Sequence, residues 1–489
     1  MKSIKKLIMT ISAAAMLAAA VAGCGPAKEA DEIPTLTWYM PKSIENMSSQ
    51  QLVEDEVNKI FEKEVGARIK LNLIDNASWV EKMNVVINSG EEFDLVFADW
   101  GNATSVRVNA EKGTYMDIKD LVEKYGQDIK AKADPRAWQF MTFNDQLLAV
   151  PSQGKYVTEI GWTFKKDLAE KYNFDYKSVK EPKDLEPYFD TLLANEPGII
   201  PCLGISFPPP EKAYTDVVGI PGVMFDEEQE KYIKYYDIPE YREEARLKHE
   251  WYKKGYIPAD ALTLNNAETY RTGKVAVMKD AGAITEDGSK SSASYGFPCA
   301  DIRVGVKNTV NGDTFRGGQA VSITSKHPEK AVQVLNLIWK DPYISNTLAY
   351  GIEDVDYVYE SGKGTDNPTV IPKEGSERTW ALWHNYIGPL FDQWDSSWNS
   401  TEALQKMQEM NNNLTISKQS TLVFDTSSIK AEIAALSEVR KASQKVFANG
   451  AMPDFDSYMA EYENKLADAG IDKVIDELNR QYREYKAAK

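Results

Sequence analysis

Apolar positions along the first hundred residues follow two alternating patterns. They predict a strand at 35–40, a helix at 52–65 with its apolar residues on one face, and a half-buried strand at 67–73. A capping-box pattern opens a second predicted helix at 78–87, and the continuous apolar run at 93–98 predicts a buried strand. Strand, helix, strand, helix, strand in this order predicts an α/β domain with a mostly parallel sheet covered by helices.

The strand predicted at 93–98 leads directly into side chains that a core strand does not need. They are Asp99, Trp100, Gly101 and Asn102. In open parallel sheets, ligands bind beyond the carboxyl ends of the strands, where the loops diverge and leave a crevice. We therefore expect these residues, with 39–42 and 75–78 at the ends of neighbouring strands, to border a binding cleft. The alternative is a turn built by Asp, Gly and Asn, with Trp100 covering the core.

The length of the chain and its later patterns predict at least two lobes. A chain of 489 residues is too long for one ordinary hydrophobic core. Residues 146–172 hold a proline and a glycine between two apolar runs, which predicts a crossover from one lobe to the other. Strand and helix patterns return at 271–278 and 317–339, and residues 467–486 predict a charged terminal helix.

The first residues of the chain have the pattern of a targeting segment. A lysine-rich start precedes an uncharged, mostly apolar run at 7–22, which is short for a membrane-spanning helix. The run ends in Val-Ala-Gly-Cys, which resembles the lipobox of bacterial lipoproteins, where cleavage leaves a lipid-modified cysteine as the new N-terminus. We expect a signal peptide at 1–23, lipid attachment at Cys24, and a tether at 24–34 that holds the protein to the lipid bilayer on the extracytoplasmic face of the cell membrane. A plain secretory signal with a chance cysteine is the alternative.

Composition and charge narrow the classes of partner. A hydrophobic content of 43% and a charged content of 27% are typical of a globular protein. The net charge of −17 repels nucleic acid, so we expect no nucleic-acid partner. Beyond Cys24, the two cysteines Cys202 and Cys299 either pair or stay free, and neither belongs to a Cys-x-x-Cys motif that would indicate a metal or redox site.

The sequence lacks the common catalytic motifs. It has no phosphate-binding glycine loop, no dinucleotide fingerprint, no His-Glu-x-x-His and no Gly-x-Ser-x-Gly. It has only three histidines, which is too few to favour general acid–base catalysis by histidine or a histidine-rich metal site. We therefore expect no enzyme, no cofactor and no bound metal. A cell-surface glycosidase stays open as an alternative, because two carboxylates suffice for that reaction and the chain has 74 acids.

Tryptophans are concentrated in places that favour sugar binding. Within one stretch of nineteen residues lie Trp380, Trp383, Trp394 and Trp398. Near the predicted strand ends and the crossover lie Trp38, Trp79, Trp100, Trp138 and Trp162. A sugar ring is held by flat aromatic faces and by polar side chains at its edge, and Asn385 and Asp392 add such groups to the first stretch. The competing interpretation of any one tryptophan is that it fills the core.

Several segments resemble a known family of receptors, the extracellular solute-binding lipoproteins of ABC sugar importers, in the maltose-binding-like class. The similar segments are the lipobox, EEFDLVFADWGN, GWTFKKDLAEKY, RTGKVAVM and GGQAVSITSKHPEKAVQVLNLIW. Three further segments resemble a subfamily that has an extra C-terminal domain of unknown role. They are YGIEDVDYVY, FDTSSIKAEIAAL and AGIDKVIDELNRQYREY. The resemblance covers nearly the whole chain after the tether. It implies an α/β, two-lobed, periplasmic-binding-protein type II-like fold with a hinge and a central cleft.

The resemblance also implies boundaries and a mode of action. Lobe 1 is expected at 35–149 and 315–352, and lobe 2 at 150–314 and 353–489, which includes the C-terminal extension. A monomer is expected to close its lobes on a carbohydrate and deliver it to the permease subunits of the importer, and the many aromatic residues favour an oligosaccharide. The alternatives are a receptor for peptides or other non-sugar solutes, and a sensing or structural lipoprotein without transport.

Nine residues are candidates for contact with the ligand. They are Trp38, Asp99, Trp100, Asn102, Gln153, Trp162, Trp380, Trp383 and Asn385. We expect Asp99 and Trp100 to act from one lobe, and Trp162, Trp383 and Asn385 to act from the other.

Overall fold

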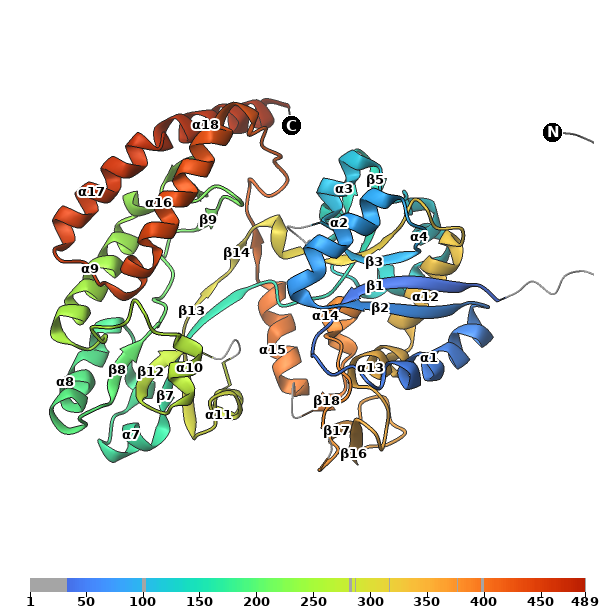
Figure 1. Cartoon of the computed structure of the whole chain (residues 1–489), viewed down its shortest axis with the longest axis horizontal. Coiled ribbons are helices and arrows are strands. Elements are labelled where there is room, and N and C mark those ends of the chain that lie inside the picture. The colour runs from blue at the N-terminus through green and yellow to red at the C-terminus, as the bar shows by residue number, and fades with distance from the viewer. Residues whose placement is uncertain are drawn as a thin grey trace, which may run out of the picture.

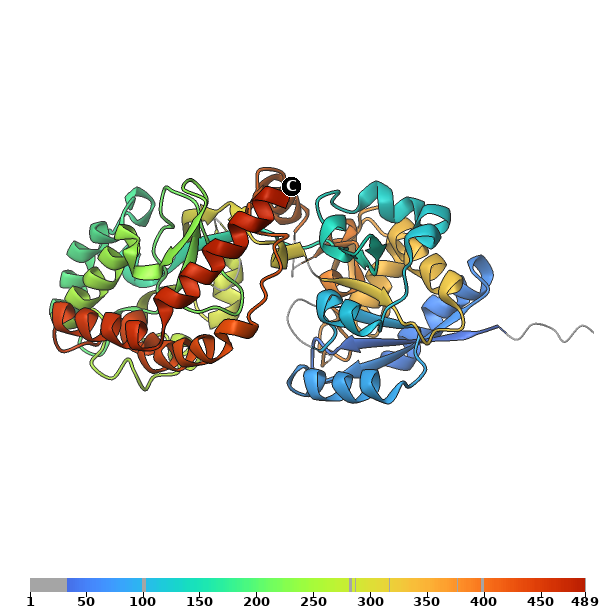
Figure 2. The same cartoon turned by 90° about the horizontal axis from the view of Figure 1, so that it is seen from above.

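The chain forms two α/β lobes that lie side by side (Figure 1) and stand clearly apart when seen from above (Figure 2). The computed structural model describes residues 33–98, 103–280, 284–285, 287–315, 317–375, 377–396 and 400–488. No helix in these ranges combines the length and the apolar character needed to cross a membrane.

The first lobe is built on a five-stranded sheet. In spatial order its strands are β2 (Arg68–Ile74), β1 (Thr35–Pro41), β3 (Leu95–Ala98), β15 (Gly318–Val321) and β6 (Ala149–Pro151). β1 pairs in parallel with β2 and β3, whereas β15 runs antiparallel to β3 and β6. The parallel arrangement predicted for the first three strands is confirmed, so their carboxyl ends share one edge of the sheet.

The first two helices connect these parallel strands. α1 (Gln50–Glu64) turns an apolar stripe to the core, and α2 (Trp79–Ser89) ends at Gly90, whose φ of +70° is left-handed and suits glycine. The capping box expected at the start of α2 is wrong. The short 3-10 turn Asn76–Ser78 runs directly into the helix, and the Ser78 side chain makes no capping hydrogen bond.

The second lobe is built on a four-stranded sheet of its own. In spatial order its strands are β13 (Cys299–Lys307), β7 (Thr158–Lys165), β12 (Val275–Lys279) and β8 (Ile200–Leu203). β7 is antiparallel to both neighbours, and β12 is parallel to β8. Cys202 and Cys299 are both free and buried, which answers the open question of a disulfide between them.

Three segments connect the lobes. The first leads from β6 to β7 through 152–157, and the second leads from β13 to β15 through 308–317. The third leads from α15 (Thr401–Asn412) into β19 (Thr415–Ile416), which pairs in parallel with β14 (Thr309–Val310) of the second segment. Backbone hydrogen bonds therefore join two of the three connections.

The third connection lies later in the chain than expected. The family resemblance implies a crossing near 352 and assigns 353–489 to lobe 2. In the structure, Trp380 and Ile387 belong to the core of the first lobe, together with the buried face of α12 (Pro328–Lys340). The expected boundary is corrected accordingly, because this stretch still buries its apolar side chains in the first lobe.

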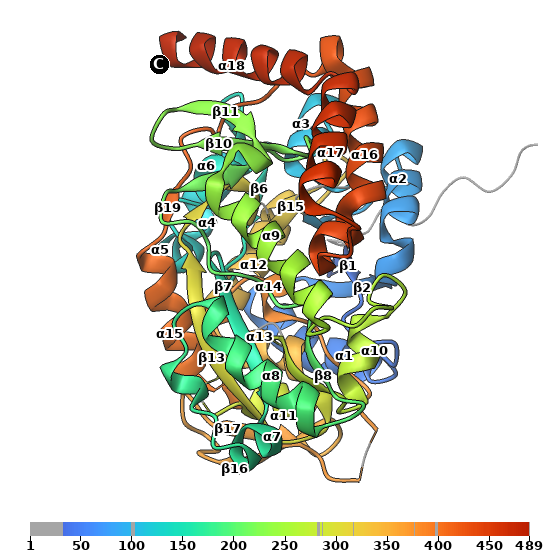
Figure 3. The same cartoon turned by 90° about the vertical axis from the view of Figure 1, so that its left-hand side faces the viewer.

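The C-terminal extension forms a helical layer on the second lobe, seen from its outer side in Figure 3. Its helices are α16 (Lys430–Asn449), α17 (Phe455–Asp468) and α18 (Ile471–Ala488). α16 packs against α9 (Pro239–Lys254), and α18 packs against β11 (Lys231–Lys234). The apolar side chains of this layer form a core with residues from 217–245, so the extension is part of the second lobe.

Candidate functional site

A hollow of about 330 Å³ lies at the hinge. Its lining consists of Phe97, residues 152–156, Thr158, residues 313–314, Gly317 and Asn385. The lining therefore comes from the carboxyl end of β3, from the first two connections between the lobes, and from α14 (His384–Ile387). We call this feature the hinge hollow. It occupies the edge where loops diverge from the parallel strands of the first sheet.

Three aromatic rings form a row from the surface of the protein to the hinge hollow. Trp383 is 50% exposed, and its ring centroid lies 5.1 Å from that of Tyr386. The Tyr386 ring lies 4.7 Å from Phe97, which lines the hollow. Ser43 Oγ accepts a hydrogen bond of 3.0 Å from the backbone N–H of Trp383 and so fixes this residue at the start of the row. Such flat apolar faces suit the C–H face of a sugar ring.

Unused hydrogen-bonding groups line the same hollow. Ser152 Oγ is buried and has no hydrogen-bond partner among the described residues. Leaving a buried hydroxyl unpaired costs about 1–3 kcal/mol, so a water molecule or a ligand hydroxyl placed there would be stabilising. Half-buried Asn385 adds a side-chain amide, which both donates and accepts hydrogen bonds.

Charged side chains surround the part of the hollow that faces the second lobe. Lys155 lines the hollow and pairs with Glu159 at 2.6 Å, and Arg303 pairs with the same carboxylate at 2.5 Å. Burial lowers the pKa of Lys290, and the nearby charge of Lys155 lowers this pKa further. The lining itself holds one charge of each sign, Lys155 and Asp313.

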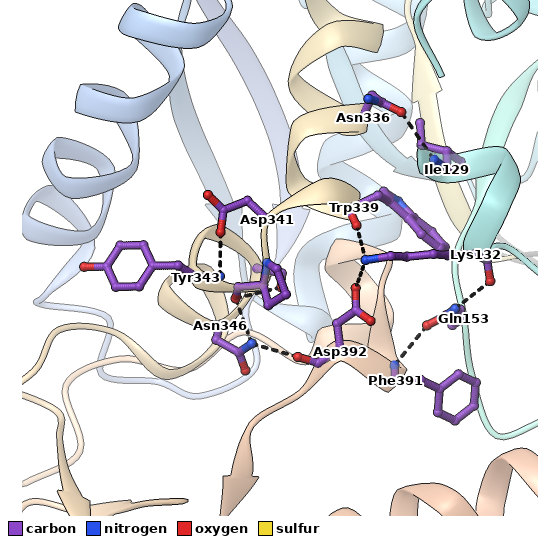
Figure 4. Close-up of polar contacts among 12 residues, drawn as sticks. Ile129, Lys132, Gln153, Asn336, Trp339, Asp341, Tyr343, Asn346, Phe391 and Asp392 are labelled. Carbon is purple, nitrogen blue, oxygen red and sulfur yellow. Dashed lines mark hydrogen bonds and ion pairs between the residues drawn. The ribbon is translucent and has the colours of Figure 1, made fainter. Parts of the chain in front are cut away.

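Gln153 fixes the wall of the hollow through its side chain (Figure 4). Its amide nitrogen donates a 2.8 Å hydrogen bond to the carbonyl of Lys132, and its amide oxygen accepts one of 2.9 Å from the backbone N–H of Phe391. Its backbone N–H donates to the carbonyl of Gly388 at 2.8 Å. Gln153 also lines the hinge hollow, and its amide keeps one N–H and one oxygen lone pair beyond these two bonds, so its contact with the ligand stays a prediction.

A second set of polar contacts supports the same wall (Figure 4). Lys132 Nζ donates to the carbonyl of Trp339 and to Asp392 Oδ2, both at 2.6 Å. Asn346 Nδ2 donates to the carbonyls of Asp392 and Pro342 at 2.9 and 2.8 Å. The segment that follows α14 is thus held on the first lobe by side chains of α5 (Gln127–Lys132) and α13 (Pro342–Tyr350), in addition to Gln153.

Comparison with known proteins identifies the fold. The N-glycan transport solute binding protein of Streptococcus pneumoniae superposes with a TM-score of 0.80 at 24% identity, covering 93% of this chain and 100% of that one. A human-milk-oligosaccharide-binding solute-binding protein of Bifidobacterium longum infantis gives 0.61 at 14% identity, covering 93% and 99%. The fold is that of type II periplasmic solute-binding proteins. The predicted fold class is confirmed.

Sequence comparison extends the likeness of this solute-binding fold over the whole chain. A carbohydrate ABC transporter substrate-binding protein of Streptococcus pneumoniae is 25% identical over 507 aligned residues, which cover 99% of both chains. Residues 420–487 match a family described as a domain of unknown function, DUF3502. The predicted resemblance to sugar-importer receptors with an extra C-terminal domain is confirmed.

Three of the predicted ligand tryptophans are core residues instead. Trp38, Trp162 and Trp380 have no exposed surface. Each indole N–H donates inside the protein: to Gln319 Oε1 at 2.8 Å, to the carbonyl of Ser206 at 2.6 Å and to the carbonyl of Leu348 at 2.8 Å, respectively. A buried indole needs one acceptor, and these three have it. Their assignment to the ligand is corrected.

Other predicted residues keep their place or lie outside the described ranges. Asn385 lines the hinge hollow, and Trp383 is connected to it through the rings of Tyr386 and Phe97; both lie on the first lobe rather than on the second as expected. Asp99, Trp100 and Asn102 lie outside the described residues, as does Cys24, so these four stay predictions.

Sequence reasoning did not find Phe97, Tyr386 or Ser152. Phe97 has the pattern of a core residue, and Tyr386 and Ser152 stand in segments without periodicity. The nearest signal was the short polar stretch at 152–155, between the two apolar runs of the predicted crossover.

The histidine of α14 is buried and neutral. Burial lowers the pKa of His384 to about 3, and its Nε2 lies 3.1 Å from Asn346 Oδ1, so the ring stays neutral near pH 7. Within the described ranges, no group of three or more His, Cys, Asp and Glu side chains is arranged to hold a metal ion.

Proposed function

We propose that the protein is the substrate-binding component of a carbohydrate ABC importer, and that its ligand is an oligosaccharide held at the hinge hollow. The likeness to a carbohydrate ABC transporter substrate-binding protein over 99% of the chain supports this function. Structures of its structural relatives are titled as complexes with Man1GlcNAc, Man5GlcNAc and kestose.

One observation supports the position of the site most directly. An exposed tryptophan begins a row of aromatic rings that ends in a hollow lined by the first two of the three connections between the lobes. A ligand stacked on Trp383 and hydrogen-bonded at Ser152 and Asn385 would lie against the first lobe and face Lys155 and Thr158, which lead into the second. A sugar is bound by aromatic faces that stack on its C–H face and by amide and hydroxyl groups that are free to form hydrogen bonds with its hydroxyl groups.

Binding at this position would favour closure of the lobes. A ligand that contacts both lobes shifts the equilibrium towards the closed state, by no more than its difference in affinity for the two states. Contacts of Asp99, Trp100 and Asn102 with the ligand are part of this proposal, because β3 leads from the hollow directly into them. The closed lobes would then form one surface for the permease subunits.

The proposal includes the place of the protein in the cell and its state. The signal peptide at 1–23 would be removed, Cys24 would carry lipid, and the tether would hold a monomer on the extracytoplasmic face of the membrane. The protein would capture its ligand without chemical change, as a receptor and not an enzyme. Mass determination of the membrane-bound protein tests the lipid, and chromatography of sugars after incubation tests the absence of turnover.

The proposed site is tested by ligand-induced thermal stabilisation. A ligand at about 100 times its Kd stabilises the folded protein by about 2.7 kcal/mol, which raises the Tm by about 5–10 °C at about 2–4 °C per kcal/mol. The screen compares neutral oligosaccharides with amino acids and short peptides. Stabilisation by an oligosaccharide supports the proposal, whereas stabilisation by peptides alone refutes the sugar and keeps the receptor.

Variants then localise the binding. Trp383→Ala is expected to weaken binding of the stabilising sugar at least about ten-fold, or about 1.4 kcal/mol. Tyr343→Ala serves as the matched control, because Tyr343 is 39% exposed and belongs neither to the aromatic row nor to the lining of the hinge hollow. Equal affinities of the two variants would refute the assignment of the ligand to the aromatic row.

A further inference from the structure

A second hollow lies in the outer part of the second lobe, between α9 and the C-terminal helices. Its volume is about 190 Å³. We call it the tyrosine pocket and define it by Tyr235, Tyr236, Tyr241, Glu244, Arg440 and Gln444. The first four residues come from the chain that leads into α9 and from α9 itself, and the last two come from α16. Figure 3 shows α9 and α16 on the side of the lobe that faces away from the first lobe.

The lining of the tyrosine pocket differs from that of a packing defect. Empty cavities in proteins are lined by aliphatic side chains and stay dry. This hollow also has apolar lining, from Phe447 and two alanines, but most of its lining side chains carry polar groups: phenol hydroxyls, a serine hydroxyl, a carboxylate, an ammonium, a guanidinium and an amide. Its volume far exceeds the roughly 10–15 Å³ that one water molecule requires, and it falls below the roughly 300–1,000 Å³ of sites for drug-sized ligands. The hollow therefore suits one small, polar ring.

The tyrosines provide flat faces and hydroxyl groups together. The rings of Tyr235 and Tyr241 are stacked, with centroids 4.3 Å apart and planes at 4°. The Tyr236 ring packs on Phe447 at 4.6 Å, which holds it in place from behind. Among the described residues, none of the three phenol hydroxyls has a hydrogen-bond partner, although burial raises the pKa of all three. Partly buried hydroxyls of this kind gain free energy from a ligand that donates to them or accepts from them.

The charged groups leave one strong donor unused. Glu244 pairs with Lys248, whereas Arg440 has no ion-pair partner within the part of the chain that the structure describes. Many other basic side chains of this acidic protein do have such a partner, including Arg242 and Arg246 on the neighbouring helix α9. The guanidinium of Arg440 can donate several hydrogen bonds to oxygen atoms of a ligand in the pocket.

We propose that the tyrosine pocket is a second binding site, which takes a single sugar ring. Aromatic faces meet the C–H face of the ring, and the phenol hydroxyls, Arg440 and Gln444 meet its hydroxyl groups. This site is separate from the hinge hollow, because the two linings share no residue. It gives a role to the matched C-terminal domain at 420–487, which supplies the α16 side of the pocket.

Saturation-transfer NMR of the full chain tests the proposal. The probes are glucose, galactose, mannose, N-acetylglucosamine and galacturonate, each added alone in millimolar excess. At least one of them is expected to receive saturation from the protein. Arg440→Gln and Gln444→Ala change exposed side chains and are each expected to weaken that signal about five-fold. Lys441→Gln is the matched control, because Lys441 is an exposed neighbour on α16 that does not line the pocket.

A third variant separates this site from the hinge hollow. Trp383→Ala is expected to leave the signal of the monosaccharide unchanged, because Trp383 belongs to the other site. Absence of saturation for all five sugars in the wild-type protein overturns the proposal. The proposal is also overturned if the signal is equal in the three variants Arg440→Gln, Gln444→Ala and Lys441→Gln. It is overturned as well if Trp383→Ala loses the signal. If no oligosaccharide binds at the hinge hollow, the proposed function is refuted, but the proposed sugar site in the tyrosine pocket is not.

Discussion

Two tryptophans of this protein are expected to respond to substitution in opposite ways. Trp162 is fully buried in the second lobe and donates to the carbonyl of Ser206, whereas half the surface of Trp383 is exposed beside the hinge hollow. Truncation of a buried tryptophan to alanine costs about 3–5 kcal/mol, because it leaves a cavity and an unpaired acceptor. At about 2–4 °C per kcal/mol for a lobe of this size, Trp162→Ala is expected to lower the Tm of the second lobe by about 6–20 °C. Trp383→Ala is expected to change the free energy of unfolding by no more than about 0.5 kcal/mol.

The assay is differential scanning calorimetry of both variants, with sugar affinity measured on the same samples below the transition. Trp162→Ala is expected to keep its affinity as long as it is folded, and Trp383→Ala is expected to lose affinity and keep its Tm. Trp162→Phe retains most of the ring and provides a folded variant if the alanine form does not accumulate. A Trp162→Ala protein with an unchanged Tm and no binding would show that this residue contacts ligand, and the reasoning from its burial would fail.

Three further predictions concern buried polar groups. Gln153→Ala removes two hydrogen bonds of the hollow wall, so a loss of about 2–3 kcal/mol of unfolding free energy is expected in urea denaturation, and an unchanged value would contradict this role. The pKa of His384 is lowered to about 3 by burial, so the unfolded chain binds a proton that the folded chain does not. Stability is therefore expected to fall as the pH drops from about 6.5 towards 3, by about 2 kcal/mol at pH 5, and His384→Gln is expected to flatten this slope in urea titrations at several pH values. Burial raises the pKa of Cys299 to about 12 and also raises that of Cys202, so neither thiol is expected to react with a thiol reagent at pH 8 until the protein is unfolded; rapid labelling of the native protein would contradict this.

The parts of the fold that the sequence predicts are those with local periodicity. The strands β1, β2 and β3 alternate or run apolar within a few residues, and the structure pairs them in parallel as predicted. The third connection was placed too early, because the described residues between 353 and 396 form only short elements, namely three strands of two to five residues, the four-residue helix α14 and a 3-10 turn. Its membership of the first lobe depends on packing against α12, which no local pattern reveals.

Local sequence patterns also did not predict which single side chains form the candidate site. A single tryptophan looks the same in the sequence whether it fills the core, as Trp38 of β1 does, or begins an aromatic row, as Trp383 before α14 does. Phe97 and Tyr386 become neighbours only when β3 and α14 meet in the folded chain. Composition thus indicated the class of ligand, while the positions of the residues depended on contacts between distant segments.

The pairing of β14 with β19 has a consequence for how the lobes can move. Thr415 N–H donates to the carbonyl of Asn308 at 3.0 Å, and Ser417 N–H donates to that of Val310 at 2.9 Å, so two of the three connections form a short ribbon. A single segment that connects two lobes permits both bending and twisting, whereas a paired ribbon with a further connecting segment beside it resists twisting. Opening and closing would then follow one axis, and each cycle would bring the same faces of the lobes back into register. The C-terminal helices follow this ribbon in the chain, so they would swing with the second lobe as one unit.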